Sequence, residues 1–310
     1  MDTTAVETNI HYPTDSSLLW DSYRTLSRIL KSVQTDLAQM GMRHRFHVKK
    51  AKKLHQYISR NAGKKNKSVN RKSKTMYKTF IERVRQIVEV AQRAELVLRS
   101  RFDTIWNAAA DELARYTPIA VKIIDQAHRR IFDGEKVPSN EKVYSLFEEH
   151  TELLIRGKAG KPIEFGHKVL IAETKEKLII HYDAYGRQPA DKDLVDETLE
   201  AHTNVFGEMP GVFATDKGFY ESMKKIEELE KKIDTVSMAK KGRRTQAQTE
   251  REHSEAFRDG QRFRAGSEGT ISVLKRAFKL NCCRFKGFKN FAASIGCAVF
   301  CHNLVMLERC

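Results

Sequence analysis

The sequence predicts an α/β protein whose mixed sheet is flanked by helices and whose first strand is followed by a large all-α insertion. Two observations carry this prediction. A strand-like opening gives way to a long stretch with helical spacing, and runs typical of strands and helices alternate after Pro138. With 310 residues, 40% of them hydrophobic, the chain can bury a substantial core. We therefore expect three regions: a first strand in 1–13, a basic helical insertion in 14–137 and the rest of the core in 138–310.

The first half of the chain predicts one strand and about four helices. Residues 2–10 are rich in β-branched side chains and end before Tyr12-Pro13, which is typical of a short strand and a turn. From about Ser16 to Phe132, apolar residues recur at helical spacing up to the Asp133-Gly134 turn. Pro118 is expected at the start of a helix, where its missing N–H costs nothing.

The second half predicts an antiparallel meander followed by alternating helices and strands. The expected strands are 143–147, 164–171, 177–182, 211–215 and 233–238, and the expected helices are 191–202, 220–231 and 250–280. Residues 240–249 read as a polar loop. The apolar segment 291–307 is interrupted by polar residues and is marginal for a bilayer span of about 20 residues, so we interpret it as a buried helix.

The charge of the chain favours a polyanionic partner. Its 56 Lys and Arg against 40 Asp and Glu give a net charge of +16, which suits nucleic acid first and an anionic membrane surface second. No acidic residue lies between Asp36 and Glu82. Fourteen basic residues do: Arg43, Arg45, Lys49, Lys50, Lys52, Lys53, Arg60, Lys64, Lys65, Lys67, Arg71, Lys72, Lys74 and Lys78. Such a run is often only a solvated helix face, but here the uncompensated repulsion favours contact with phosphates.

The cysteines indicate neither a secreted framework nor a zinc site. Five cysteines, clustered near the C-terminus, do not make a disulfide scaffold, so a reducing compartment is expected. Residues 1–10 show no signal-peptide pattern, which favours a cytoplasmic protein. Cys282-Cys283 and Cys297-x3-Cys301-His302 lack the usual zinc-ligand spacing, so we interpret these thiols as core residues.

Three acidic residues stand out by their positions in the predicted elements. Asp216 follows an apolar strand, and open α/β sheets bind ligands beyond the carboxyl ends of strands. Taken alone it would also fit a helix N-cap or a turn. Asp2 opens the first strand and, taken alone, reads as a terminal polar residue. Glu268 lies in the middle of the late helix.

The late helix carries charges on one face. Arg264, Glu268 and Lys275 fall within about 40° of one helical line. A solvated i,i+4 ion pair would explain the first two, but apolar residues beside them indicate a partly enclosed face. These neighbours are Phe263, Ile271, Leu274 and Phe278. A carboxylate flanked by two cations suits a divalent metal ion near a phosphodiester.

The spacing on this helix resembles the DDE-class transposases of bacterial insertion sequences. Their signature is tyrosine, two residues, arginine, three residues, glutamate, six residues, lysine; Arg264, Glu268 and Lys275 match it, and Gln261 replaces the tyrosine. Residues 263–276 and Asn303-Leu304 resemble the family's sequence around this signature. Residues 214–219 resemble its second-aspartate block, 2–7 its first-aspartate strand, and 186–191 the segment before the intervening helix.

The resemblance implies a ribonuclease-H-like catalytic core that cleaves and transfers DNA strands. It implies two Mg²⁺ (or Mn²⁺) ions held by Asp2, Asp216 and Glu268, with Arg264 and Lys275 on the phosphates of the transposon ends. The basic region would hold flanking DNA, chiefly through Lys49, Lys50, Lys52, Lys53, Lys64, Lys65 and Lys67. Further expectations are a homodimer or higher oligomer on DNA, no membrane partner, and a place near the bacterial nucleoid.

Several alternatives stay open at this point. Family members carry an upstream helical region before the first aspartate, so a truncated or split copy is expected here. A catalytically silent DNA-binding remnant or regulator is the main alternative function, and a basic helical adaptor is a weaker one. Glu148 could replace Asp2 as a carboxylate. His167 and Lys168 are weaker candidates for DNA contact, and a satisfied strand histidine is the more common case.

Overall fold

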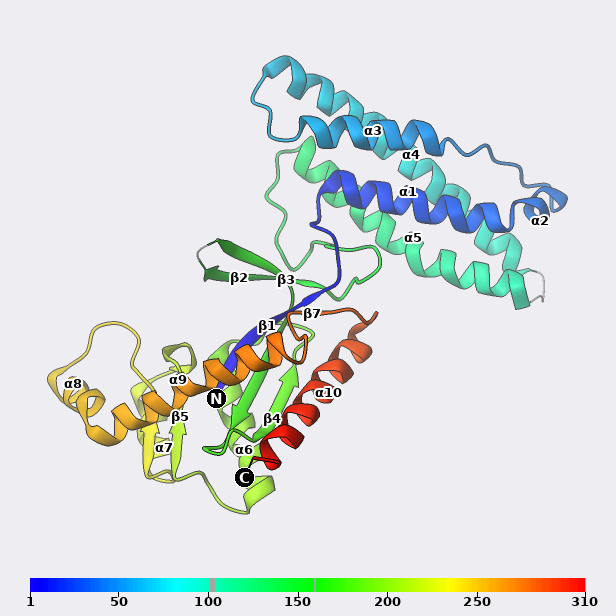
Figure 1. Cartoon of the computed structure of the whole chain (residues 1–310). Coiled ribbons are helices and arrows are strands. Elements are labelled where there is room, and N and C mark those ends of the chain that lie inside the picture. The colour runs from blue at the N-terminus through cyan, green and yellow to red at the C-terminus, as the bar shows by residue number, and fades with distance from the viewer. Residues whose placement is uncertain (101–103, 159, 310) are drawn as a thin grey trace. The chain divides into compact units, whose positions relative to one another are not determined.

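The chain folds into two compact units (Figure 1). The computed structural model describes residues 1–100, 104–158 and 160–309. The sheet unit combines Met1–Asn9 with His150–Cys310, and the helical unit is Ile10–Glu149. Within the described residues, all strands belong to the sheet unit. They form a five-stranded mixed sheet and a two-stranded parallel sheet, and helices accompany both. The prediction of a mixed α/β protein is therefore confirmed.

The helical unit is built from amphipathic helices around one core. Its elements are α1 (Asp15–Ser32), α2 (Gln34–Gln39), α3 (Val48–Asn61), α4 (Lys67–Arg99) and α5 (Thr104–Ile131). Thr14 and Ser17 form a capping box at the start of α1. Leu26, Leu30, Phe80 and Leu113 are fully buried in this core. The expectation of about four helices matches the four long ones, and α2 is a short addition.

Pro118 lies inside α5 and does not begin a helix as predicted. A proline in a helix interior removes one backbone hydrogen bond and disfavours regular geometry. Here Leu113 and Ile123 on either side are fully buried, so packing of the apolar face holds the helix together through the proline.

The main sheet is organised by one long strand, β3 (Lys161–Glu173). Its first half pairs with β2 (Glu152–Lys158) and its second half with β4 (Ile179–Ala184), all antiparallel. On its other side it pairs antiparallel with β1 (Asp2–Thr8). Gly166 permits this close approach, since a Cβ there would lie 2.0 Å from the carbonyl oxygen of Val6. A two-residue strand, β7 (Cys282–Cys283), pairs in parallel with the end of β1. This strand was not predicted.

The strand predicted at 143–147 is wrong. These residues form no strand, and Val143 and Leu146 are buried in the core of the helical unit. The side-chain amide of Gln126 accepts from the N–H of Val143 and donates to its carbonyl oxygen, at 2.9 and 3.2 Å. The apolar run therefore serves burial against helices, and its backbone is satisfied by a side chain instead of a neighbouring strand.

A second, two-stranded parallel sheet joins β5 (Val212–Ala214) and β6 (Thr235–Ser237). It is accompanied by α6 (Val195–Phe206), α7 (Met223–Glu230) and the short 3₁₀ turns η1 (Asp191–Leu194) and η2 (Lys217–Phe219). The backbone nitrogen of Met1 donates to the carbonyl oxygen of Ala214 at 3.0 Å. This bond places the start of β1 beside the end of β5.

The predicted helix 250–280 is two helices. Ser254 adopts an extended conformation between α8 (Gln246–His253) and α9 (Glu255–Arg276), and its side chain accepts from the N–H of Phe257 to cap α9. The α9 helix contacts β1, β5 and β6. The last helix, α10 (Phe288–Leu307), packs on β4.

Helix α10 is buried on one face only, which corrects the expectation of a buried helix. Phe291, Ile295, Val299 and His302 face the core, while large apolar residues on the opposite face are exposed. By length and composition, with a mean hydropathy of 1.5, it is the one helix in the described part of the chain that could cross a membrane. A single helix of this kind is weak evidence for a span.

Candidate active site

Asp2 and Asp216 come together where β1 meets β5. Asp216 directly follows Thr215 at the end of β5, and its Oδ1 accepts from the N–H of Gly218 at 2.5 Å. The turn-and-cap interpretation of Asp216 is therefore correct, and it coexists with a place beside Asp2. We call Asp2, Asp216 and Glu268 the acidic cluster. Burial raises the pKa of the Asp2 carboxyl, its hydrogen bond from the N–H of Thr3 lowers it, and the negative charge of Asp216 raises it further.

Arg264 links the first aspartate to the glutamate on α9. Its Nη1 lies 3.7 Å from Oδ2 of Asp2, and its Nη2 lies 3.5 Å from Oε1 of Glu268. The Arg264 and Asp2 side chains are 19% and 15% exposed, whereas Glu268 is 67% exposed. Two of the sequence-predicted acids, Asp2 and Glu268, thus contact one guanidinium, although they are separated by 266 positions in the chain.

Gln261, at the signature's tyrosine position, anchors α9 to the ends of two strands. Its Nε2 donates to the carbonyl oxygens of Thr215 at 3.1 Å and Ser237 at 2.6 Å. One residue earlier, a Cβ on Gly260 would lie 2.5 Å from the Cβ of Ser237, so only glycine allows this approach. Because Thr215 precedes Asp216, the same amide fixes the second aspartate relative to the helix that carries Glu268.

A buried carboxylate anchors the middle of α9 to the end of β3. Glu173, whose side chain is 1% exposed, accepts from the hydroxyl of Ser267 at 2.9 Å and from the ammonium of Lys177 at 2.7 Å. The Lys177 ammonium also lies over the ring of Phe263 at 5.4 Å. Ser267 precedes Glu268, so this network and Gln261 hold α9 on both sides of Arg264.

A fourth carboxylate, which sequence reasoning missed, lies next to Asp216. The Asp191 Oδ2 and Asp216 Oδ1 atoms lie 3.0 and 2.6 Å from the point where a Gly218 side chain would begin. Lys168 donates to Asp191 Oδ1 at 2.8 Å and to the carbonyl oxygen of Pro189 at 2.8 Å. The only signal was the position of Asp191 at the end of the block 186–191, because its partner Lys168 is remote in sequence.

The other candidates differ in where they lie. Lys275 is on α9, partly exposed and seven residues beyond Glu268. Glu148 belongs to the helical unit and is 5% exposed. His167 is fully buried, its Nε2 lies 2.7 Å from Nδ1 of His150, and burial lowers its pKa to about 4. His167 is therefore a neutral strand residue, and the weaker expectation of DNA contact is wrong for it.

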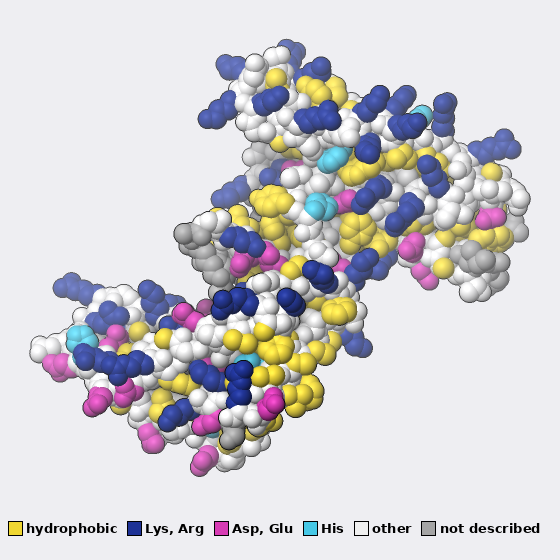
Figure 2. Space-filling view, viewed as in Figure 1, with side chains coloured by type: hydrophobic (Ala, Val, Ile, Leu, Met, Phe, Trp, Pro, Cys, Tyr) yellow, Lys and Arg dark blue, Asp and Glu magenta, His cyan; other side chains and the backbone are white. Residues whose placement is uncertain are grey.

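The basic residues between Asp36 and Glu82 lie exposed on the surface of the helical unit. All fourteen are exposed, on α3, on the first half of α4 and on the segments that precede them. Within the described residues, none of them forms an ion pair with an acidic side chain. Figure 2 shows Lys and Arg side chains spread over this unit. We call these fourteen residues the basic surface.

The acidic cluster offers the carboxylate oxygens that a Mg²⁺ site uses, but its side chains do not form a preformed metal site. Among the residues described, no group of three or more His, Cys, Asp or Glu is close enough to hold a metal ion. The oxygen donors nonetheless fit a hard divalent cation, and burial together with the charge of Asp216 raises the pKa of the Asp2 carboxyl, so nearby positive charge would stabilise its ionised form. Arg264 now supplies part of that charge.

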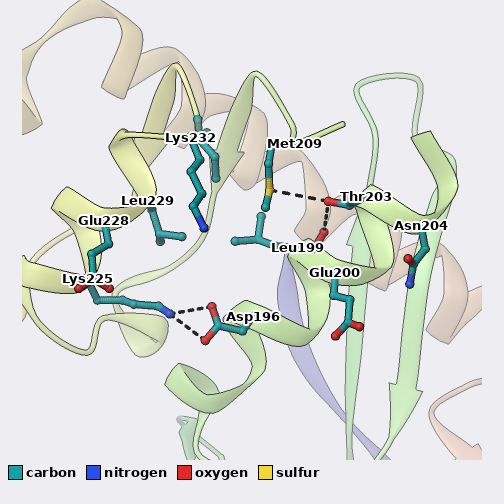
Figure 3. Close-up of a pocket in the computed structure, with 11 residues that line it drawn as sticks. Asp196, Leu199, Glu200, Thr203, Asn204, Met209, Lys225, Glu228, Leu229 and Lys232 are labelled. Carbon is teal, nitrogen blue, oxygen red and sulfur yellow. Dashed lines mark hydrogen bonds and ion pairs between the residues drawn. The ribbon is translucent and has the colours of Figure 1, made fainter. Parts of the chain in front are cut away.

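A separate cavity of about 320 Å³ lies between α6 and α7 (Figure 3). Lys225 and Asp196, which form an ion pair of 2.7 Å, line this cavity together with Leu199 and Leu229. Asp2, Asp216 and Glu268 do not line this cavity, so the candidate active site is the acidic cluster.

Comparison with known proteins adds no assignment: no family model, curated protein or solved structure matches the sequence or its fold.

We expect Asp2→Asn to stabilise the metal-free protein at pH 7. The pKa of Asp2 is higher in the folded than in the unfolded chain, so its favourable contribution is complete below the unfolded pKa and is lost as pH rises through the folded pKa. The neutral amide avoids the cost of burying a charge. The melting temperature should rise by about 2–4 °C, the shift that about 1 kcal/mol gives in a unit of this size.

The pH dependence of this gain is the control. Near pH 3, below the unfolded pKa of about 3.9, the carboxyl is largely protonated in both states, so the gain should disappear. Calorimetric scans of both proteins at pH 3 and 7 measure it. Equal melting temperatures at pH 7, or a gain that grows toward acid pH, would contradict the burial of an ionised Asp2.

Proposed function

We propose that this chain is a DDE-type DNA transposase core, which cleaves DNA and transfers its strands in a metal-dependent reaction. The observation that carries the proposal is the assembly around Arg264. Asp2 and Glu268 both contact its guanidinium, and the charge of Asp216 acts on Asp2. Three acids, in the order and blocks that resemble the DDE family, are thus linked through pairwise electrostatic interactions although their elements are far apart in sequence.

The fold supports the proposal. Antiparallel strands β4, β3 and β1 are followed in space by parallel β5 and β6, because Met1 bonds to Ala214. Helix α9 packs over β1, β5 and β6 and carries the glutamate. The ribonuclease-H-like fold uses such an arrangement, with antiparallel strands on one side of the first strand, parallel strands on the other and acids at the strand ends. The helical unit then takes the place of an insertion after the first strand.

In the proposed reaction, Asp2, Asp216 and Glu268 would hold two Mg²⁺ or Mn²⁺ ions. Bound there, the ions would activate water or a DNA 3′-hydroxyl and stabilise the leaving oxygen. The chain's own residues supply the positions. Gln261 and the Glu173–Ser267 hydrogen bond fix α9, and the turn from Asp216 to Gly218 fixes the second aspartate. No covalent protein intermediate is needed.

Arg264 has two roles in this proposal. Without other cations it neutralises Asp2 and Glu268. Once other cations neutralise these carboxylates, the guanidinium of Arg264 is free to bind a phosphate of the DNA. Its planar arrangement of N–H donors is well suited to a phosphate. Lys275 lies on the same helix face, and the basic surface would hold flanking DNA by charge neutralisation.

The alternative is a catalytically silent DNA-binding remnant or regulator of transposition. It is favoured by the 67% exposure of Glu268 and by the lack, within the described residues, of a preformed group of three metal-ligating side chains. Both functions require DNA binding by the basic surface, so an assay of metal-dependent cleavage separates them.

Nicking of a supercoiled plasmid tests the catalytic proposal. The chain should nick DNA with Mg²⁺ or Mn²⁺, lose this activity with chelator, and lose it in Glu268→Gln and Asp216→Asn. Because both residues are proposed as direct ligands, the loss should exceed the about 10–100-fold typical of residues that only support a ligand.

Asp259→Asn is the matched control for nicking. Asp259 lies on the same helix and pairs with Arg262 at 2.7 Å, much as Glu268 pairs with Arg264. It should keep nearly full activity. Equal nicking by the wild type and Glu268→Gln would refute the assignment of Glu268, and no metal-dependent nicking by any form would favour the silent DNA-binding protein.

Salt dependence of duplex binding tests the basic surface. Changing Lys49, Lys50, Lys52 and Lys53 to Ala should lower the slope of log K against log salt by about 3–4, because each phosphate contact contributes about 0.9. A control with the same loss of charge replaces Lys175, Lys192, Lys231 and Lys232, which are exposed in the sheet unit. Fluorescence anisotropy with a random duplex measures both, and an equal loss of slope in the control would show that the basic surface is not the binding face.

A further inference from the structure

Helix α10 carries an exposed apolar stripe that no residue of the sheet unit covers within the described chain. Ala293, Cys297, Phe300, Leu304 and Leu307 recur at alternating steps of four and three residues, which is the spacing of a helix–helix seam. Phe300, Leu304 and Leu307 are 64%, 51% and 58% exposed. Figure 2 shows hydrophobic side chains gathered over this helix. We call these five residues the α10 stripe.

The order of side-chain sizes in the α10 stripe makes it complementary to itself. If a second copy packs antiparallel about a twofold axis between Ala298 and Val299, Ala293 of one copy lies opposite Leu304 of the other. In the same register Cys297 lies opposite Phe300. Both of these pairs set a small against a large side chain, as close packing between helices requires, whereas Leu307 lies opposite Asn290. A parallel pair would instead stack Phe300 on Phe300 and Ala293 on Ala293.

Charge also favours a second copy in this orientation. The stripe contains no charged residue, whereas the chain as a whole carries +16 and would repel a copy approaching elsewhere. Lys286 and Lys289 flank the start of α10, where the helix dipole disfavours cations. In this register an antiparallel pair places Lys289 level with Glu308 of the other copy, just past the end of its α10, where the helix dipole attracts cations.

We propose that the α10 stripe is a homodimer interface in which two copies of α10 pack antiparallel. The dimer forms without DNA or metal, so the proposal stands independently of the catalytic one. A seam of one helix on each side is smaller than a standard interface of about 1,600 Å². We therefore expect a dissociation constant of the order of micromolar.

Sedimentation equilibrium of the full chain, from about 1 to 100 μM, tests the dimer. After nuclease treatment and in about 1 M NaCl, where charge-mediated bridging by nucleic acid is screened, the wild type should show a monomer–dimer equilibrium. Phe300→Glu with Leu304→Glu should be monomeric throughout, a shift in dissociation constant of at least 100-fold. Val205→Glu is the control: Val205 is 59% exposed on α6, off the stripe, and its change should leave the dimer intact.

Disulfide cross-linking tests the register. In a background with Cys297, Cys301 and Cys310 changed to Ser, cysteines at 293 and 304 should cross-link two chains upon oxidation with copper phenanthroline. Within one helix these positions are about 16 Å apart, too far for a disulfide that needs Cα atoms about 4.4–6.8 Å apart, so any bond joins two copies. The single variants Ala293→Cys and Leu304→Cys should not cross-link.

Three outcomes would overturn the proposal. A monomer at 100 μM excludes a micromolar interface. Cross-linking by the single Ala293→Cys variant shows a parallel pair. Binding of a monomer to phosphatidylcholine vesicles, lost in the Phe300→Glu and Leu304→Glu double variant, shows that the stripe meets a membrane instead of a second copy.

Discussion

The position of helix α9 against the ends of β1, β5 and β6 is the constraint on which the candidate site depends. The close approach is possible because Gly260 lacks a side chain that would collide with Ser237. Gln261 then bonds the two strand ends, and Ser267 bonds the buried carboxylate of Glu173. These contacts lie on both sides of Arg264, so the helix cannot turn without breaking buried hydrogen bonds, which are costly to leave unmade.

Electrostatics then explains why the arginine and the acids adopt this arrangement. Burial and the neighbouring Asp216 both disfavour ionised Asp2, so the site is destabilised unless a cation is near. Arg264 is that cation in the protein alone, and it is shared with the more exposed Glu268. A site that carries excess negative charge near a helix rich in cations has the charge distribution that metal-dependent phosphodiester chemistry uses.

The sequence predicted those features that depend on local spacing. Strand β1, the end of β5 at Asp216 and the shared face of Arg264 and Glu268 follow from periods of two and 3.6 residues. The break at Ser254 was missed because the helical pattern continues on both sides of a capping serine. Residues 143–147 were mistaken for a strand because an apolar run indicates that it is buried but not what it packs against, and its backbone here pairs with the side chain of Gln126 on the preceding helix, α5. Asp191 was missed for the same reason, since it depends on Lys168 across the fold.

The claim that Asp2, Asp216 and Glu268 form one metal site is tested most directly by Mn²⁺ bound to the crystalline protein. Anomalous diffraction locates Mn²⁺ without reference to activity or DNA. We expect Mn²⁺ within about 2.0–2.6 Å of carboxylate oxygens of these residues, with the Arg264 guanidinium turned away from them. Mn²⁺ absent from this cluster at saturating concentration, with Arg264 still between Asp2 and Glu268, would contradict the claim.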